Sequence, residues 1–204
     1  MFNFFKIFIF IFCIVATDCS IASNKAPHLT QDEIDILRRK NFRTPQEKQV
    51  LFKALGVKYI KHVLPHESMK PSLYNKYFCS MSNLNLHNTC INNHFSKKIV
   101  EGYIVPISIQ WINQRIGFGA FAQTDLQEGE FVGEYTGKIK SMSSWTDAKY
   151  IWGLGMMRTQ DKDELSVDAL HHGNELRFFN DNADESNCEA KQVLGRDGII
   201  HVVY

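Results

Sequence analysis

The hydrophobic and polar positions divide this chain of 204 residues into three parts. The first part contains an unbroken apolar run at residues 7–16. The second part ends near residue 98 and has apolar positions at helical spacing between polar ones. In the third part, short runs of β-branched residues alternate with glycine turns, a pattern typical of strands. The pattern predicts a leader at 1–22, a helical accessory segment at 23–98 and a β-rich domain at 99–204.

Two short helices are expected in the accessory segment, because each has a clear start signal. Thr30 and Glu33 have the spacing of a capping box, and a short apolar stripe follows them. Thr44 and Glu47 repeat this spacing with proline at the first helical position. Gly56 then ends the second helix.

The part after residue 98 predicts strands at 103–112, 120–121, 130–135 and 165–167. No helical pattern alternates with these strands, which excludes a doubly wound α/β domain. The sequence therefore predicts an α+β fold that is mostly β, with several small sheets preceded by a short helical segment.

The N-terminal run has the features of a secretory signal peptide. Lys6 precedes the apolar stretch, and Ser20 and Ala22 are small residues at the positions that a signal peptidase reads. A membrane-spanning helix needs about twenty apolar residues, so this run is too short to cross. We expect cleavage after Ala22, export, and no stable membrane anchor afterwards. An uncleaved helix lying in the membrane interface is the alternative.

The charges nearly balance, with 23 Lys and Arg against 22 Asp and Glu and a net charge of +1. This balance argues against direct binding to nucleic acid, which normally needs a basic excess. The hydrophobic fraction of 44% is that of a globular protein and excludes wholesale disorder and a multi-pass membrane protein. Residues 58–98 hold six lysines and only one acid, Glu67. They form either a solvated face or a surface that meets an acidic partner.

Three cysteines remain after the predicted cleavage, Cys79, Cys90 and Cys188. An odd number permits one disulfide, and Cys79 with Cys90 is the close pair. Cys79, His87, Cys90 and His94 are all zinc-ligand types, but their spacing fits no common zinc pattern. A disulfide and plain loop residues remain open for this pair, and we predict no metal site.

Two blocks of sequence resemble the SET domain, the fold of protein-lysine methyltransferases. Residues 117–137, GFGAFAQTDLQEGEFVGEYTG, resemble its opening, with a G-x-G turn, an acidic G-E turn and an E-Y-x-G strand. Residues 166–180, SVDALHHGNELRFFN, resemble its second signature, an Asp-Ala strand followed by G-N-x-x-R-F-x-N. The blocks stand in the family's order. The resemblance implies a SET-type, β-clip-like fold for residues 99–204.

The resemblance also implies a cofactor, S-adenosylmethionine, and the residues around it. The glycine turn would face the methionine part, Asn180 its ammonium group, and the main chain at Asp181 the adenine. Tyr150 would lie near the cofactor or the lysine channel and is the candidate catalytic residue. The implied cofactor-binding residues are Gly117, Phe118, Gly119, Tyr150, Arg177, Phe178, Asn180 and Asp181.

Residue chemistry alone leaves alternatives open at these positions. Gly117 and Gly119 allow a close main-chain approach to a ligand, and they equally suit an ordinary hairpin turn. The amide of Asn180 can donate and accept at once, as recognition of an amino acid requires, or it can tie down a loop.

The chain departs from the family pattern at two places. Asp181 stands where the family has histidine, and acidic residues follow it. Residues 198–204 resemble the strand that leads into the family's G-E-E-L-x-x-D-Y segment, which carries its catalytic tyrosine. We therefore expect this chain to lack that C-terminal segment.

Three hypotheses follow for the function. The first is methyl transfer from S-adenosylmethionine to lysine side chains of proteins such as histones, by an exported effector that acts inside a host cell. The second is a non-catalytic SET-derived module that binds protein, or an inactive fragment. The third is an unrelated secreted β-rich domain. For the first, an apolar, aromatic-walled channel would favour the neutral lysine amine.

Overall fold

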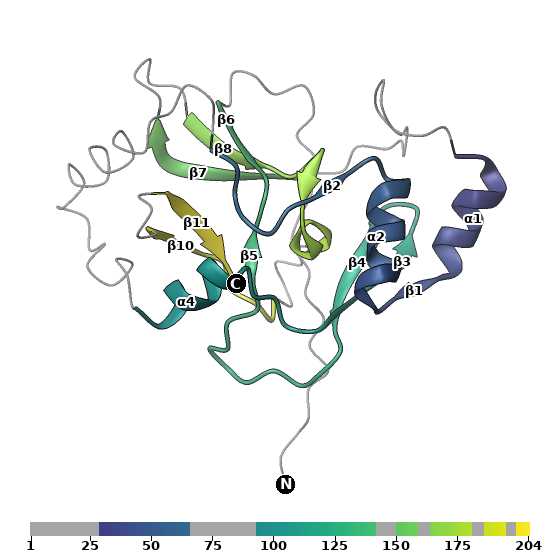
Figure 1. Cartoon of the computed structure of the whole chain (residues 1–204), viewed down its shortest axis with the longest axis horizontal. Coiled ribbons are helices and arrows are strands. Elements are labelled where there is room, and N and C mark those ends of the chain that lie inside the picture. Colours follow the sequence, from purple (N-terminus) through teal and green to yellow (C-terminus); the bar gives the residue numbers. More distant parts are fainter. Residues whose placement is uncertain (1–28, 66–92, 142–149, 159–163, 181–185, 195–198) are drawn as a thin grey trace, which may run out of the picture.

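The structure is a computed structural model that describes residues 29–65, 93–141, 150–158, 164–180, 186–194 and 199–204. Several small sheets surround the centre of the molecule, with α1 and α2 beside one sheet and α4 beside another (Figure 1). The helices are α1 (Gln31–Arg39), α2 (Pro45–Ala54), α4 (Asn93–Glu101) and the 3₁₀ helix η3 (Glu175–Phe178).

The described strands form four small sheets. Their orders are β1-β3-β4, β10-β11-β5, β6-β8-β7 and the parallel pair β2-β9. This arrangement confirms the predicted α+β, mostly β fold class. The strands are β1 (Asn41–Phe42), β2 (Lys58–Tyr59), β3 (Ile107–Asn113), β4 (Gly117–Ala122), β5 (Glu134–Tyr135), β6 (Lys138–Ser141), β7 (Ile151–Arg158), β8 (Glu164–Asp168), β9 (His172–Gly173), β10 (Lys191–Leu194) and β11 (Ile200–Val203).

Both predicted helix starts are confirmed as capping boxes. The Glu33 N–H donates to the Thr30 hydroxyl at 3.3 Å, and the Glu33 carboxylate accepts from the Thr30 N–H at 2.8 Å. Thr44 and Glu47 make the same two bonds at 3.3 and 3.0 Å. Gly56, with φ +66°, directly follows the C-cap of α2 in the left-handed region that favours glycine.

Two predicted strands are shorter than the sequence pattern suggests. The strand predicted from residue 103 begins at Ile107, because Pro106 has no N–H to give to a ladder. The strand predicted at 130–135 is reduced to Glu134–Tyr135. Before it, the N–H of Val132 donates to the Tyr204 carbonyl, so these residues bond to the chain end near the centre of the molecule (Figure 1).

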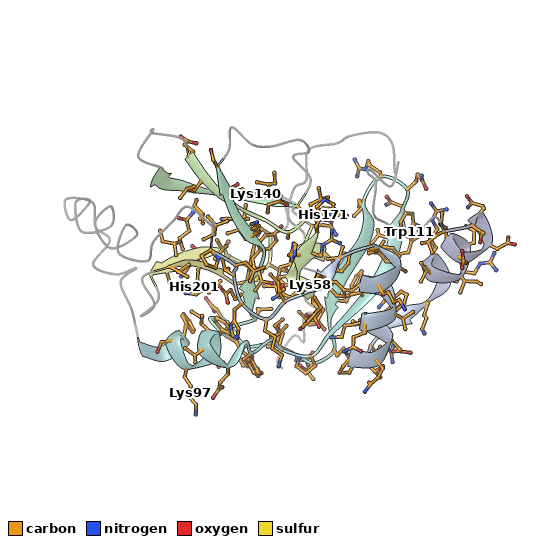
Figure 2. The ribbon with its side chains drawn as sticks, turned by 45° about the horizontal axis from the view of Figure 1, so that its top comes forward. Lys58, Lys97, Trp111, Lys140, His171 and His201 are labelled. Atoms are coloured by element: carbon orange, nitrogen blue, oxygen red, sulfur yellow. The ribbon has the colours of Figure 1, made fainter. Side chains whose placement is uncertain are left out.

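The hydrophobic core continues across residue 98, where the sequence pattern changes. In β1, Phe42 is fully buried and pairs with Ile109 of β3. Leu51 and Phe52 of α2 join the same cluster as Leu176 of η3. The parallel pair β2-β9 ties the accessory segment to the third part of the chain a second time. Within it, the main-chain N–H of Lys58 donates to the His171 carbonyl at 2.8 Å (both residues are labelled in Figure 2). The described residues 29–65 of the accessory segment therefore pack as part of the same core.

Some predictions lie outside the described residues. They are the signal peptide at 1–22, and Cys79, His87 and Cys90. Within the described part, no helix is long and apolar enough to cross a membrane.

Candidate functional site

Asn180 lies against the glycine turn, although 62 positions separate it from Phe118. Its side-chain Nδ2 donates to the Phe118 carbonyl at 3.2 Å and to the Phe178 carbonyl at 3.0 Å. Both amide hydrogens are therefore directed at main-chain carbonyls, which leaves the Oδ1 atom as the acceptor of this side chain. In the described contacts, Asn180 ties the end of the second block to β4. Its contact with a cofactor stays a prediction.

Gly119 leaves little room for a side chain where β4 passes Asn180. A Cβ at this position would lie 2.4 Å from Ile112 Cδ1 and 3.3 Å from Asn180 Nδ2. Gly117, at the start of β4, has φ +82° and would be strained with any side chain. The two glycines thus have different structural roles. Gly117 allows the backbone to turn, and Gly119 allows Asn180 to approach β4 closely.

The two blocks of sequence are joined at two further points. Asn174 is almost completely buried, and its Nδ2 donates to the Glu134 carbonyl at 2.7 Å. The Oδ1 atom of the same side chain accepts from the Leu176 N–H at 3.1 Å and caps η3. At the second point, Gly137 packs on the backbone of Asp168, where a Cβ would lie 2.5 Å from the carbonyl oxygen. These contacts hold the second block at a fixed place on the first.

The Arg177 guanidinium stacks on the Tyr150 ring and bonds to main-chain carbonyls just after β8. Its Nε donates to the Ala169 carbonyl at 3.0 Å, and its Nη2 to the Leu170 carbonyl at 3.3 Å. Its Cζ lies 3.8 Å from the centroid of the Tyr150 ring. Because this guanidinium is buried and bonded to the protein, its described contacts are structural.

Tyr150 has an unusual backbone conformation with φ +61°. Its carbonyl accepts from the Tyr135 hydroxyl at 2.7 Å and from the Ala169 N–H at 2.9 Å. A tyrosine rarely adopts left-handed φ unless its surroundings hold it there, and such residues cluster at functional sites. These two bonds and the Arg177 contact together supply that restraint.

Phe118 and Phe178 direct their side chains into the core. Their ring centroids lie 6.1 Å apart in an edge-on arrangement. Phe118 also contacts Phe42 and Trp111, and Phe178 contacts Phe52. If these two residues bind the cofactor as predicted, they would do so through main-chain atoms.

An aromatic group that no sequence pattern indicates is linked to Tyr150 through Tyr135, whose hydroxyl donates to the Tyr150 carbonyl. Trp152 contacts Tyr204 at 5.9 Å and Tyr135 at 6.4 Å between ring centroids, and Phe179 contacts Tyr204 at 5.1 Å. Among the described residues, the buried Nε1 of Trp152 has no hydrogen-bond acceptor. No sequence signal joins these residues, because they lie in four separate stretches of the chain.

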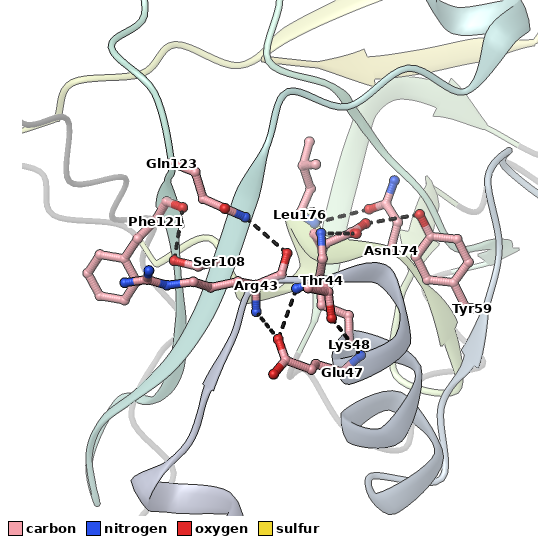
Figure 3. Close-up of polar contacts among 11 residues, drawn as sticks. Arg43, Thr44, Glu47, Lys48, Tyr59, Ser108, Phe121, Gln123, Asn174 and Leu176 are labelled. Atoms are coloured by element: carbon pink, nitrogen blue, oxygen red, sulfur yellow. Dashed lines mark hydrogen bonds and ion pairs between the residues drawn. The ribbon is translucent and has the colours of Figure 1, made fainter.

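Two buried clusters of ionisable side chains are likewise not indicated by any sequence pattern. Glu134 and His201 form a pair inside the sheet β10-β11-β5, with Oε1 and Nδ1 2.5 Å apart. Glu175 of η3 is bonded to Lys48 of α2 and to Tyr59 of β2 (Figure 3). Burial, and then the negative charge of the Glu175 carboxylate, raise the pKa of the Tyr59 hydroxyl.

Asp181, the remaining predicted site residue, lies outside the described residues. In the part of the chain that the structure describes, no group of three or more potential metal ligands comes together. The described site thus consists of β4, the end of the second block, Tyr150 and the aromatic group.

Comparisons with known proteins find similarity to SET-domain proteins. Residues 117–204 match the family model described as SET domain. Histone-lysine N-methyltransferase MEDEA of Arabidopsis thaliana is 35% identical over 83 residues, which cover 39% of this chain and 12% of that protein. Histone-lysine N-methyltransferase trithorax of Drosophila virilis is 36% identical over 90 residues, which cover 41% of this chain and 2% of that protein. The chain thus matches only a small part of either relative.

Two solved structures share the fold at low sequence identity. ATXR5 in complex with histone H3.1 mono-methylated on R26 has a TM-score of 0.52 at 16% identity, over 76% of each chain. KRYPTONITE in complex with mCHH DNA, an H3(1-15) peptide and SAH has a TM-score of 0.52 at 18% identity. That match covers 72% of this chain and 38% of the other.

Proposed function

We propose, from the match of residues 117–204 to the SET-domain family model, that the chain binds S-adenosylmethionine and methylates lysine side chains of proteins. The observation that carries the proposal is the junction of Asn180 with the glycine turn of β4. It joins the two signature blocks at the place where the resemblance puts the cofactor.

The residues at this junction fit the amino-acid end of the cofactor. Both amide hydrogens of Asn180 are engaged by the carbonyls of Phe118 and Phe178. Its Oδ1 is therefore the atom suited to accept a hydrogen bond from an ammonium group. The main chain of Gly117 and Gly119 would face the methionine part without side chains in between. The bound cofactor would supply an electrophilic methyl group.

The aromatic group would prepare the lysine for the reaction. An amine attacks only when it is neutral, and apolar surroundings disfavour the ammonium form. Trp152, Phe179 and Tyr204 would provide such surroundings, since they contact one another in the core cluster against which Tyr150 also packs. The restrained backbone of Tyr150 would hold its ring in one orientation, which favours alignment of the reacting groups.

A histone is the substrate that we propose first. The relatives MEDEA and trithorax are named as histone-lysine methyltransferases, and the structures of ATXR5 and KRYPTONITE contain histone H3. The substrate would be tested by transfer of a labelled methyl group to histones, with mass spectrometry of the products. We expect the label on lysine.

Titration calorimetry with S-adenosylmethionine tests the proposed site. We expect Asn180→Ala to abolish the binding that the unchanged protein shows. Gln123→Ala is the matched control, because it removes another amide that bonds a main-chain carbonyl, that of Arg43, beyond the far end of β4 (Figure 3). Equal affinity of the Asn180 variant and the unchanged protein would refute the placement. If the unchanged protein binds no cofactor, the non-catalytic protein-binding module is favoured instead.

We further propose that the protein is exported after cleavage behind Ala22, and that it acts as an effector inside another cell. The support is the Lys6 and apolar pattern of the N-terminus. Sequencing the N-terminus of the secreted protein would test this, with Ser23 expected as the first residue. A mature protein that begins at Met1 would contradict it.

A further inference from the structure

Glu175 is bonded by two side chains of the accessory segment. The Lys48 Nζ donates to Oε1 of Glu175 at 2.8 Å, and the Tyr59 hydroxyl donates to Oε2 at 3.1 Å (Figure 3). The Glu175 side chain is only 7% exposed, and that of Lys48 12%. These three residues, which we call the clamp, come from α2, β2 and η3.

The clamp lies at the start of the turn that positions Asn180. η3 spans Glu175–Phe178, and Asn180 follows two residues later. Asn174 fixes the beginning of η3 through its bond to the Glu134 carbonyl. A rotation of η3 would therefore change the direction of the Asn180 amide.

An aromatic contact between α2 and η3 supports the same turn. Phe52 of α2 packs edge-on against Phe178 at 5.7 Å and against Tyr59 at 5.3 Å between ring centroids. This apolar contact would hold α2 to η3 without any charge. The clamp adds direction, since two bonds to separate carboxylate oxygens fix the rotation of the Glu175 side chain.

Stability alone does not explain a buried ion pair at this place. Removing two charges from water is unfavourable, and apolar residues of similar volume are often equally stabilising. What an apolar pair cannot supply is a fixed hydrogen-bonding direction. We propose that Lys48 and Tyr59 are positioning residues that act through Glu175 to orient η3 and hence Asn180. This rests on the proposed function in that Asn180 is taken as a cofactor-binding residue.

The test compares three variants by titration calorimetry with S-adenosylmethionine, at a temperature where thermal melts show each variant folded. Lys48→Met with Glu175→Leu replaces the ion pair by an apolar pair. We expect it to remain folded and to bind about tenfold more weakly, the lower end of the effect seen when a residue that orients a metal ligand is lost. Lys48→Arg keeps the charge and should retain affinity. Lys53→Met is the control, an exposed lysine on the same helix.

A second measurement separates failure of the clamp from failure of the proposed function. The side-chain amide resonances of Asn180 are recorded by NMR without cofactor, in the unchanged protein and in the double variant with Lys48→Met and Glu175→Leu, which we call the apolar-pair variant. We expect these resonances to shift in the apolar-pair variant and to stay in place in Lys53→Met. Unshifted resonances, or unchanged cofactor affinity in the apolar-pair variant, would overturn the clamp. If the resonances shift but the unchanged protein binds no cofactor, the orienting contact is supported and the proposed function is wrong.

Discussion

Gly137 offers the sharpest test of how the two signature blocks fit together. It precedes β6 and packs on the backbone of Asp168 at the end of β8. An added Cβ would lie 2.5 Å from the Asp168 carbonyl oxygen and 2.8 Å from Val167 Cγ1. Real Cβ contacts essentially never fall below 3.0 Å, so the backbone of β8 must move in Gly137→Ala.

The expected loss follows from what would have to move. β8 is the central strand of the sheet β6-β8-β7, and its Val167 is fully buried. Overpacking that shifts a buried backbone lowers the free energy of unfolding by about 1–3 kcal/mol, and we expect the upper end of this range. For a protein of this size, that corresponds to a melting temperature about 5–10 °C lower.

Urea and thermal unfolding followed by circular dichroism measure this loss. Gly153→Ala is the matched control, since Gly153 also lies in this sheet and a Cβ there would meet nothing within 4 Å. The control should change stability by less than about 0.5 kcal/mol. If both variants were equally stable, Gly137 would not be packed as described and the contact between the blocks would be wrong.

Three other predictions follow from the described contacts. Thr44→Ala should lower the free energy of urea unfolding by about 1 kcal/mol through loss of the α2 cap; no loss would contradict the cap. Burial, and then the charges of Lys58 and His171, lower the pKa of His172, so the unfolded state binds more protons. Stability should therefore fall as the pH drops from 7 toward 5, and His172→Gln should make the fall in melting temperature shallower; parallel profiles would count against this. Burial raises the pKa of Cys188 to about 11. In a variant with serine at the other cysteines, iodoacetamide at pH 8 should therefore alkylate Cys188 slowly until urea is added. Equal alkylation rates with and without urea would refute its burial.

Local features of the fold could be predicted from the sequence. The helix starts at Thr30 and Thr44 depend on residues three positions apart, and both capping boxes are present. The mostly β character and the pairing of the two signature blocks also follow from short motifs. The resemblance placed Asn180 near Gly119, and the structure brings them together.

Contacts between distant segments could not be predicted in this way. The bond from Lys48 to Glu175 joins residues 127 positions apart, and neither residue stands out in its own stretch. The strand pairs β1-β3 and β2-β9 involve two-residue strands, which are too short for an alternating pattern. Arg177 could equally have met a ligand or the main chain, and only the fold shows its bond to the Ala169 carbonyl.

The most direct test of the central claim is an NMR titration of the labelled protein with S-adenosylmethionine. The amides of Gly117 and Gly119 and the side-chain amide of Asn180 should shift together and give one dissociation constant. Residues of α4, which lies across the molecule from β4, should not shift (Figure 1). If the cofactor shifted other residues and left these three unchanged, or caused no shifts at all, the proposed site would be wrong.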